Sequence, residues 1–436
     1  DRGFDVLNPT TRSGVFGDGN TLPIDDRDGL DNGGSCPTIT LTGNIPDPVA
    51  MAVVQGDPNC FSLEETIPGG FKPRFGGTMT GQAFLFDLEG QTANGLDWDV
   101  SSYYGRNEAD FFINNTVNAS MDLASIRDFD PGLYRQIETL VNANFTYSIS
   151  EDVSLVFGVE YRVEEFTIGA VDEASSTAGT LGDQGYSLSS NGFPGFFKTI
   201  DGVFDLSNYS TYIEAEWDTS DDLLVTAALR FEDFGTTTNY KLGFNYHLND
   251  DVGIRVTYST GFKAPTSGRS NASDVSTVID DITGKLVNKG TIRATSPVVL
   301  LYGSKVLELG YSINVTFGVC VTVGAFDITL DWFDIDVEDR LNLSKDVDLS
   351  AADIAKLKAD NVPAAGDMSQ FRFLINDFDT NTNGIDLVIS TSTDWFGGTT
   401  AWNLAYNKTT TAITNCGNTI DAERERSLED MTPDTR

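Results

Sequence analysis

The sequence predicts an all-β protein, an antiparallel up-and-down barrel whose strands cross a membrane, and three observations lead to that prediction. Apolar and polar residues alternate with a period of two along much of the chain, which is typical of strands with one apolar face. Short and long connections alternate between these strands, as they do at the two rims of a membrane barrel. The apolar runs are far shorter than the roughly 18 residues that a spanning helix needs, so only strands closed into a barrel can cross a bilayer.

The alternation is clearest from Val153 to Phe166, where one face is apolar and the other carries Glu160, Arg162 and Glu164. In a membrane barrel the first face meets lipid and the second lines the lumen. Comparable segments predict about twelve strands of about 9 to 12 residues, the crossing length of a tilted strand. They lie at residues 83–88, 96–101, 141–148, 153–166, 208–218, 223–232, 240–247, 252–263, 307–319, 326–337, 385–391 and 402–406.

The connections sort into two kinds. Tight polar turns are expected at residues 90–94, 148–152, 218–222, 249–251 and 394–398. Long connections are expected at residues 106–134, 167–206, 264–304 and 339–370, with one short exception at 233–238 on the same side. Because an outer-membrane barrel has short periplasmic turns and long extracellular loops, the long connections are predicted to face the cell exterior. Aromatic residues near strand ends fit either an interfacial girdle or ordinary β-propensity; they are Tyr103, Tyr104, Tyr161, Phe166, Trp217 and Phe262.

The charge balance excludes one class of partner. The chain has 65 acidic and 28 basic residues, a net charge of −37. Nucleic acid is not expected as a partner, because phosphate binding needs basic stripes. The acidic surface is interpreted mainly as solvated loops, although a negative mouth can also concentrate cationic ligands.

Two stretches have a helical pattern. The first runs from Ser350 to Asn361, where Ser350 is a candidate N-cap and Asp353 follows three residues later. We expect this helix to lie within a long outer loop. The second covers residues 422–431 near the end of the sequence.

Several segments resemble TonB-dependent receptors of gram-negative bacteria. The most extended is TYSTGFKAPTSGRSN (residues 257–271), where a strand leads into Pro265 and a long loop. Further similar segments are FDTNTNGIDLVIS (378–390), FGG (75–77), DFFINNTVNAS (110–120), DDRDGLDNGGSCP (25–37) and SNGFPGF (190–196). The resemblance runs from about Asn8 to the C-terminal end of the sequence.

The resemblance implies a larger architecture, a barrel of about 22 strands plugged by an N-terminal domain. The sequence departs from that pattern because it has about half of the strands, no TonB box or plug before Asp1 and no aromatic-ended last strand. We therefore expect it to be a piece of a longer receptor. Its expected parts are a long extracellular loop region at 1–76, barrel strands and loops at 77–411, and an extracellular loop at 412–436.

The function that the resemblance implies is the import of a scarce nutrient across the outer membrane of a gram-negative bacterium. The small ligand is a ferric siderophore, a cobalamin or an oligosaccharide. The expected partners are outer-membrane lipid and the TonB complex, which acts through the plug. The alternative function is a passive porin-like channel or a surface-exposed structural or adhesive β-protein.

Candidate site residues are few. Phe193, Phe196 and Phe197 lie in a long outer loop and are candidates for ligand contact, although they can equally pack the loop against its neighbours. Cys36 and Cys60 have a spacing that suits a loop-closing disulfide. Cys320 and Cys416 are expected to be free.

Catalytic, metal-binding and cofactor-binding residues are not expected. His247 is the single histidine; metal and haem sites need partner ligands, and no nucleophile elbow accompanies His247 for hydrolysis. The acidic run at residues 25–31 lacks the spacing of an EF-hand and is interpreted as a solvated turn-rich loop. The sequence therefore predicts a transporter and not an enzyme.

Overall fold

The structure of the chain is a computed structural model. It describes residues 21–22, 25–26, 36–37, 39–42, 45–61, 67, 71–181, 188–198, 200–233, 236–279, 286–300, 302–360, 368–417 and 426. The second predicted helix, at 422–431, lies outside the described residues apart from residue 426, and most of the acidic run at 25–31 also lies outside them.

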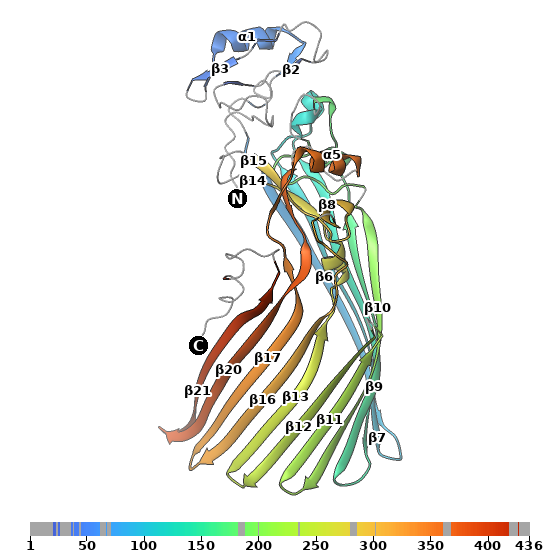
Figure 1. Cartoon of the computed structure of the whole chain (residues 1–436), viewed down its shortest axis with the longest axis vertical. Helices are drawn as coiled ribbons and strands as arrows, with labels where there is room; N and C mark the ends of the chain where they lie inside the picture. The colour runs from blue at the N-terminus through green and yellow to red at the C-terminus, as the bar shows by residue number, and fades with distance from the viewer. Residues whose placement is uncertain are drawn as a thin grey trace.

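One antiparallel sheet of twelve strands dominates the structure (Figure 1). Each strand pairs with its sequence neighbours in the sheet, so the topology is up-and-down, with β6 and β21 as the two edges. We call this twelve-stranded sheet the wall. The predicted all-β fold and the predicted number of strands are confirmed. The strands are β6 (Arg74–Gln91), β7 (Leu96–Asn114), β8 (Phe129–Ser148), β9 (Val153–Gly169), β10 (Gly202–Ser220), β11 (Leu223–Glu232), β12 (Thr237–Asn249), β13 (Val252–Lys263), β16 (Gly310–Val323), β17 (Phe326–Leu343), β20 (Leu374–Trp395) and β21 (Gly398–Cys416).

The two rims of the wall differ as predicted (Figure 1). At the lower rim the strands are joined by turns of two to four residues, including 221–222, 250–251, 324–325 and 396–397. The turn between β20 and β21 places Phe396 and Gly397 at φ 50° and 79°, the left-handed region that glycine adopts most easily. The upper rim carries the long connections, at 115–128, 170–201, 264–309 and 344–373.

Many strands are longer than the predicted 9 to 12 residues. β8 has 20 residues and begins within the segment 106–134 that the sequence assigned to a loop. β20 has 22 residues and begins at Leu374, well before the predicted start at Ile385. β6 begins at Arg74 and β21 ends at Cys416, outside the predicted limits of 77 and 411. The reason is that the upper parts stand above the membrane, where water meets the wall. A period-two apolar pattern, which marks a buried or lipid-facing side, is therefore absent there.

The outward face carries aromatic rows at two heights. Residues paired directly across strands share a face of the sheet, and the pairing puts Tyr104, Tyr161, Tyr209, Tyr240, Tyr258, Tyr311, Trp332 and Tyr406 on the apolar face. The Tyr161 and Tyr209 rings stack at 4.4 Å. Tyr209 and Trp217 of β10 are exposed by 58% and 53%. They stand eight positions apart, or about 26 Å along a strand, which matches the apolar band of a membrane barrel between its aromatic girdles.

Two of the aromatic residues named as girdle candidates belong to the other face. Tyr103 pairs with Leu140, which pairs with Arg162, and Phe166 pairs with Gln136. Both rings therefore lie on the inner, charged side of the wall. The period-two rule fixes this outcome, because Tyr103 and Tyr104 are neighbours and must point to opposite faces.

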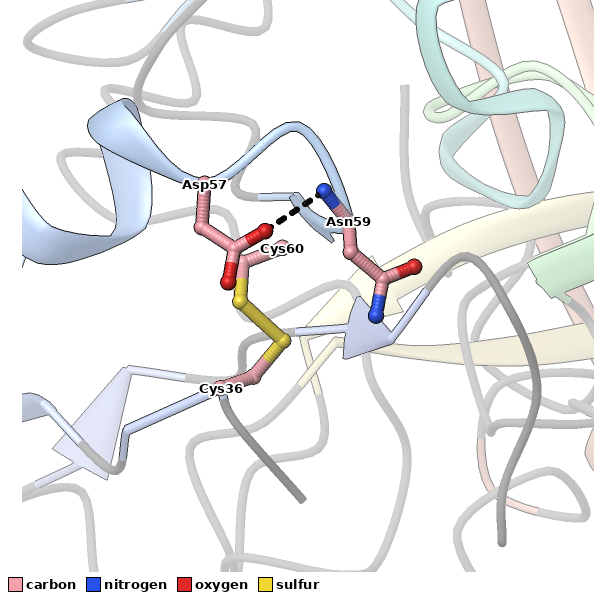
Figure 2. Close-up of a disulfide and its surroundings, with 4 residues drawn as sticks. All are labelled: Cys36, Asp57, Asn59 and Cys60. Carbon is pink, nitrogen blue, oxygen red and sulfur yellow. Dashed lines mark hydrogen bonds between the residues drawn. A yellow bond between two sulfur atoms is a disulfide. The ribbon is translucent and has the colours of Figure 1, made fainter. Parts of the chain in front are cut away.

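A small disulfide-linked unit precedes the wall. Cys36 and Cys60 are bonded, with their Cα atoms 5.4 Å apart (Figure 2). The backbone N–H of Asn59 donates to Oδ1 of Asp57 at 3.0 Å, which forms the turn that leads into Cys60. A buried cluster of Ile39, Met51, Val54 and Cys60 forms the core of the unit. Its elements are β3 (Ile39–Thr42), β4 (Ile45–Pro46), α1 (Pro48–Gly56) and β5 (Cys60–Phe61), while β1 (Thr21–Leu22) pairs with β3 and β2 (Asp25–Asp26) pairs with β5.

The predicted helix at Ser350 is present as α5 (Ala351–Ala359), and it lies in an upper loop. Ser350 is its N-cap: its hydroxyl accepts from the N–H of Asp353 at 3.2 Å, and the Asp353 carboxylate accepts from the N–H of Ser350 at 2.9 Å. This is a capping box, which satisfies two N–H groups at the start of a helix. No helix among the described residues has the length and apolar character needed to span a bilayer.

Candidate functional site

The inner face of the wall carries charged side chains that are paired with one another. Arg162 contacts Glu138 at 3.3 Å and Glu164 at 2.8 Å. Lys241 contacts Glu214 at 3.4 Å on the neighbouring part of the wall. Arg230 with Glu160 and Glu232, and Arg255 with Asp331, complete this set. These cations are neutralised within the wall, so they are poor candidates for binding an external anion.

The upper loops form two structured covers, and the first joins the β7–β8 and β9–β10 connections. Asn118 directly precedes η1 (Ala119–Ala124) and forms an isolated antiparallel bridge with Ser190. Its carboxamide donates to the carbonyl oxygens of Ala174 at 2.9 Å and Thr177 at 2.8 Å, beside η2 (Glu173–Ser175). Because Asn118 is fully buried and bonded to both connections, it fixes the two loops together.

Phe193 and Phe196 of the first cover pack against the inner face of the strands below. Phe196 is 3% exposed. Its ring lies 4.6 Å from that of Tyr134, and the Phe193 ring lies 4.4 Å from that of Phe75. Phe111 lies beside both phenylalanines. Phe196 therefore packs the loop against its neighbours. Phe193 and Phe197 are only half-buried. Ligand contact by Phe193, Phe196 and Phe197 stays a prediction.

The second cover joins the β13–β16 and β17–β20 connections. β15 (Leu286–Thr291) pairs in parallel with β19 (Met368–Arg372), flanked by β14 (Asp274–Ile279) and β18 (Val347–Asp348). Helix α4 (Pro297–Leu300) contributes Val299 to a buried cluster with Leu357 of α5 and with Phe371 and Phe373. The two loops therefore form one folded unit with its own core.

The start of the β13–β16 connection turns inward. Helix α3 (Ser267–Asn271) is capped by Thr266, whose hydroxyl accepts from the N–H of Arg269 at 3.2 Å. A Cβ added at Gly268 would lie 3.3 Å from the Phe166 ring on the inner face of β9. The phenolic O–H of Tyr134, also on the inner face, donates to the Ser273 carbonyl at 3.2 Å. The segment after β13 is thus held across the lumen side of the wall.

A cavity of about 590 Å³ lies between α3 and the upper parts of β13, β16, β17 and β20. Its polar lining includes Lys263 at the end of β13, Arg269 of α3 and Arg340 near the end of β17. Asp339 is the single carboxylate among the lining residues. The neutral polar groups of the lining are Ser312, Asn314 and Thr382, and the apolar part comprises Phe262, Ile335, Val337 and Leu341 together with Tyr311. We call this cavity the basic pocket.

The three cations of the basic pocket have no ion pair with any described residue, unlike those of the wall. Arg340 is held in place by other contacts: Nη1 donates to Thr380 Oγ1 at 2.9 Å, and the guanidinium lies 5.4 Å from the centre of the Phe378 ring. Lys263 and Arg269 are exposed. An unneutralised group of cations is a site where an anion gains charge-assisted hydrogen bonds.

The residues of the basic pocket were not predicted as ligand contacts from the sequence, although part of the signal was present. Lys263 and Arg269 stand within seven residues of each other in the segment that carries the family resemblance, in a chain where acids outnumber bases. Arg340 joins them only through the fold, because it lies 71 positions after Arg269.

The other predicted residues lie elsewhere. His247 is exposed on the inner face near the 250–251 turn. Its backbone N–H donates to the Asp222 carbonyl at 2.8 Å. Cys320 is a free thiol on β16. Within the described part of the chain, no group of three or more His, Cys, Asp or Glu residues is placed to hold a metal ion.

The wall, its aromatic rows and its sorted rims define an outer-membrane β-barrel protein. The family model described as TonB dependent receptor-like, beta-barrel matches residues 10–431, so the chain belongs to that family. It is 34% identical over 73 residues to the vitamin B12 transporter BtuB of Vibrio cholerae, a match that covers 16% of this chain and 12% of the relative.

Solved structures with a similar fold include the siderophore receptor PirA from Acinetobacter baumannii, at 15% identity and a TM-score of 0.47. That likeness covers 83% of this chain and 47% of PirA. The FrpB iron transporter from Neisseria meningitidis is 13% identical with a TM-score of 0.47, and 80% of this chain and 46% of FrpB are covered. The chain thus spans about half the length of these structures and much less of the curated relative.

Proposed function

We propose that the chain is the barrel portion of a receptor that captures a scarce nutrient outside the cell and imports it across the outer membrane. The import is energised by the TonB complex acting through a plug. The candidate nutrients are a ferric siderophore, a cobalamin and an oligosaccharide. Membership of the receptor family supports this function.

The observation that carries the proposal is the covered mouth of the wall. Two folded loop units stand at the upper rim. Below them, α3 and the upper parts of β13, β16, β17 and β20 bound a cavity of about 590 Å³, within the range of small-molecule sites. A passive pore gains nothing from closing its mouth with loops that have their own buried cores. A receptor needs such a structure, because a binding pocket must be largely pre-formed.

The test uses the complete protein in its native outer membrane. Cells lacking the gene are supplied with the full-length protein and offered ferric siderophores, cobalamin and oligosaccharides at limiting concentration. Uptake of one class that stops when the TonB complex is deleted is the expected result. Uptake of small solutes that continues without TonB, with steady conductance in planar bilayers, would establish the passive channel instead.

A further inference from the structure

From the charges around the basic pocket we infer the class of ligand: a compact anion with two or more negatively charged oxygen groups, and not a neutral sugar chain. This inference rests on the proposed function and deepens it. The pocket has three cations, Lys263, Arg269 and Arg340, and one carboxylate, Asp339. It is therefore a positively charged site in a chain with a net charge of −37.

The cations come from three separate elements, so their meeting depends on the fold. Lys263 ends a strand of the wall, Arg269 lies on α3 in the first long loop of the second cover, and Arg340 lies near the end of β17. The mutual repulsion of three like charges costs free energy unless a counter-charge is present. Since no described carboxylate forms an ion pair with any of the three, unlike the cations elsewhere on the wall, the counter-charge is expected from a ligand.

The geometry around Arg340 favours an oxygen anion. Its Nη1 is occupied by Thr380 and its guanidinium lies over Phe378, which fixes the plane of the side chain. An arginine held in this way presents its remaining N–H groups in a fork that matches the paired oxygens of a carboxylate, phosphate or catecholate. Lys263 and Arg269 are exposed and can adjust to a second anionic group.

The acidic surroundings narrow the class further. An anion approaching the mouth is repelled by the many carboxylates of the chain, so long-range attraction does not provide the affinity. Only a ligand that contacts several of the three cations at once gains enough binding free energy to offset this repulsion. A ligand with a single charge, or with widely separated charges, is therefore disfavoured.

The experiment compares two ferric complexes of similar size, one anionic and one neutral. The probes are a trianionic iron(III) tris-catecholate and a neutral iron(III) tris-hydroxamate, titrated into the full-length receptor in detergent by calorimetry. We expect the anionic complex to bind at least about tenfold more tightly, a difference that corresponds to about 1.4 kcal/mol. Raising the salt concentration should reduce its affinity and leave that of the neutral complex unchanged.

Variants locate the effect. Replacing all three cations by glutamine (Lys263→Gln, Arg269→Gln, Arg340→Gln) should remove the preference for the anionic complex. Lys305→Gln, which removes the same charge from a lysine paired with Glu308 outside the pocket, should retain it. If the triple variant fails to fold, the single variants Lys263→Gln and Arg269→Gln replace it as the test, because each changes only an exposed side chain. Each should weaken anion binding by about threefold or more.

Equal affinity for the two complexes, or unchanged anion binding in a folded triple variant, would overturn the inference. The second result would mean that another part of the full-length protein neutralises the cations. The proposed function fails on a different observation, the absence of TonB-dependent uptake. A receptor that imports a neutral ligand, unaffected by the triple variant, would refute the anion assignment and keep the transport function.

Discussion

Arg255 and Asp331 form a two-pronged ion pair across the full width of an intervening strand. Nε of Arg255 donates to Oδ1 at 2.8 Å, and Nη2 donates to Oδ2 at 2.5 Å. The residues stand on β13 and β17, and Gly318 of β16 pairs directly with both. A Cβ added at Gly318 would lie 2.1 Å from Asp331 Oδ1 and 2.6 Å from Arg255 Nε. Glycine at this position therefore leaves the space in which the ion pair lies flat on the inner wall.

Gly318→Ala should displace this ion pair and destabilise the wall. The added methyl group occupies the space of both charged groups, and such overpacking typically costs about 1–3 kcal/mol. Thermal unfolding of the full-length protein in detergent, followed by the heat-dependent change in gel mobility, measures the loss. Gly243→Ala is the matched control, because its nearest neighbour, Thr226 Cβ, lies at an ordinary 3.5 Å. Equal unfolding temperatures for the two variants would contradict this account of Gly318.

The capping box of α5 predicts a dependence on pH in the second cover. Hydrogen bonds from the Ser350 hydroxyl, from Tyr302 and from the Ser350 N–H hold the pKa of Asp353 below its usual value. The hydrogen bond that Tyr302 donates to Asp353 raises the pKa of Tyr302 to about 12. A carboxylate with a lowered pKa contributes stability that is fully present above its unfolded pKa of 3.8. That contribution is lost as the pH falls through the lower, folded pKa.

Hydrogen exchange of the α5 amides, corrected for intrinsic rates, tests this prediction. Protection of these amides should be constant near neutral pH. It should fall once the pH drops below the pKa of a free aspartate side chain. Ser350→Ala should remove about 1 kcal/mol of helix stability at neutral pH and should flatten the acid response. Asp360→Asn removes a carboxylate at the other end of the same helix and should leave the response intact. An acid response that persists in Ser350→Ala would show that another group is responsible.

The Cys36–Cys60 bond is expected to determine whether the N-terminal unit stays folded. It closes a segment with a sequence separation of 24 residues, and chain entropy assigns such a crosslink roughly 3 kcal/mol. The buried cluster beside it has only a few side chains. The double variant Cys36→Ser, Cys60→Ser should therefore be cut by protease within residues 36–61 at a concentration that spares the native protein. Cys320→Ser removes a free thiol and should resemble the native protein; equal resistance of all three proteins would refute the prediction.

The sequence predicted the membrane part of the wall because lipid and lumen impose a two-residue period. Val159 and Tyr161 face outward, whereas Glu160 and Arg162 face inward, as the alternation indicated. Above the membrane, the two-residue period of apolar and polar residues no longer identifies the strands. Arg106 and Glu108 lie on the outward face of β7 and pair with each other at 2.7 Å, so polar residues occupy both faces there and the strand was assigned to a loop.

The covers and the basic pocket were beyond prediction for a different reason. The parallel pairing of Lys289 with Gln370 joins segments that are 81 positions apart, and neither segment has a local pattern that specifies the other. Such pairing is selected by the shared core around Leu357 and Phe371, which forms only once both loops meet. The sequence could suggest Ser350 as a helix start because a capping box is a local interaction.

Phe196 provides the last prediction, which separates its packing role from the ligand contact proposed for its neighbours. Phe196→Ala should release the 188–198 segment from the inner wall, because truncating a buried phenylalanine costs about 3–5 kcal/mol and its ring contacts Tyr134, Phe111 and Phe193. The expected result is faster hydrogen exchange in this segment and weaker binding of every ligand. Phe197→Ala, at a half-buried position with no ring contact among the described residues, should keep normal exchange. If Phe197→Ala nevertheless weakens binding of the ferric complexes, Phe197 contacts the ligand; if Phe196→Ala leaves exchange unchanged, the anchoring role assigned to Phe196 is wrong.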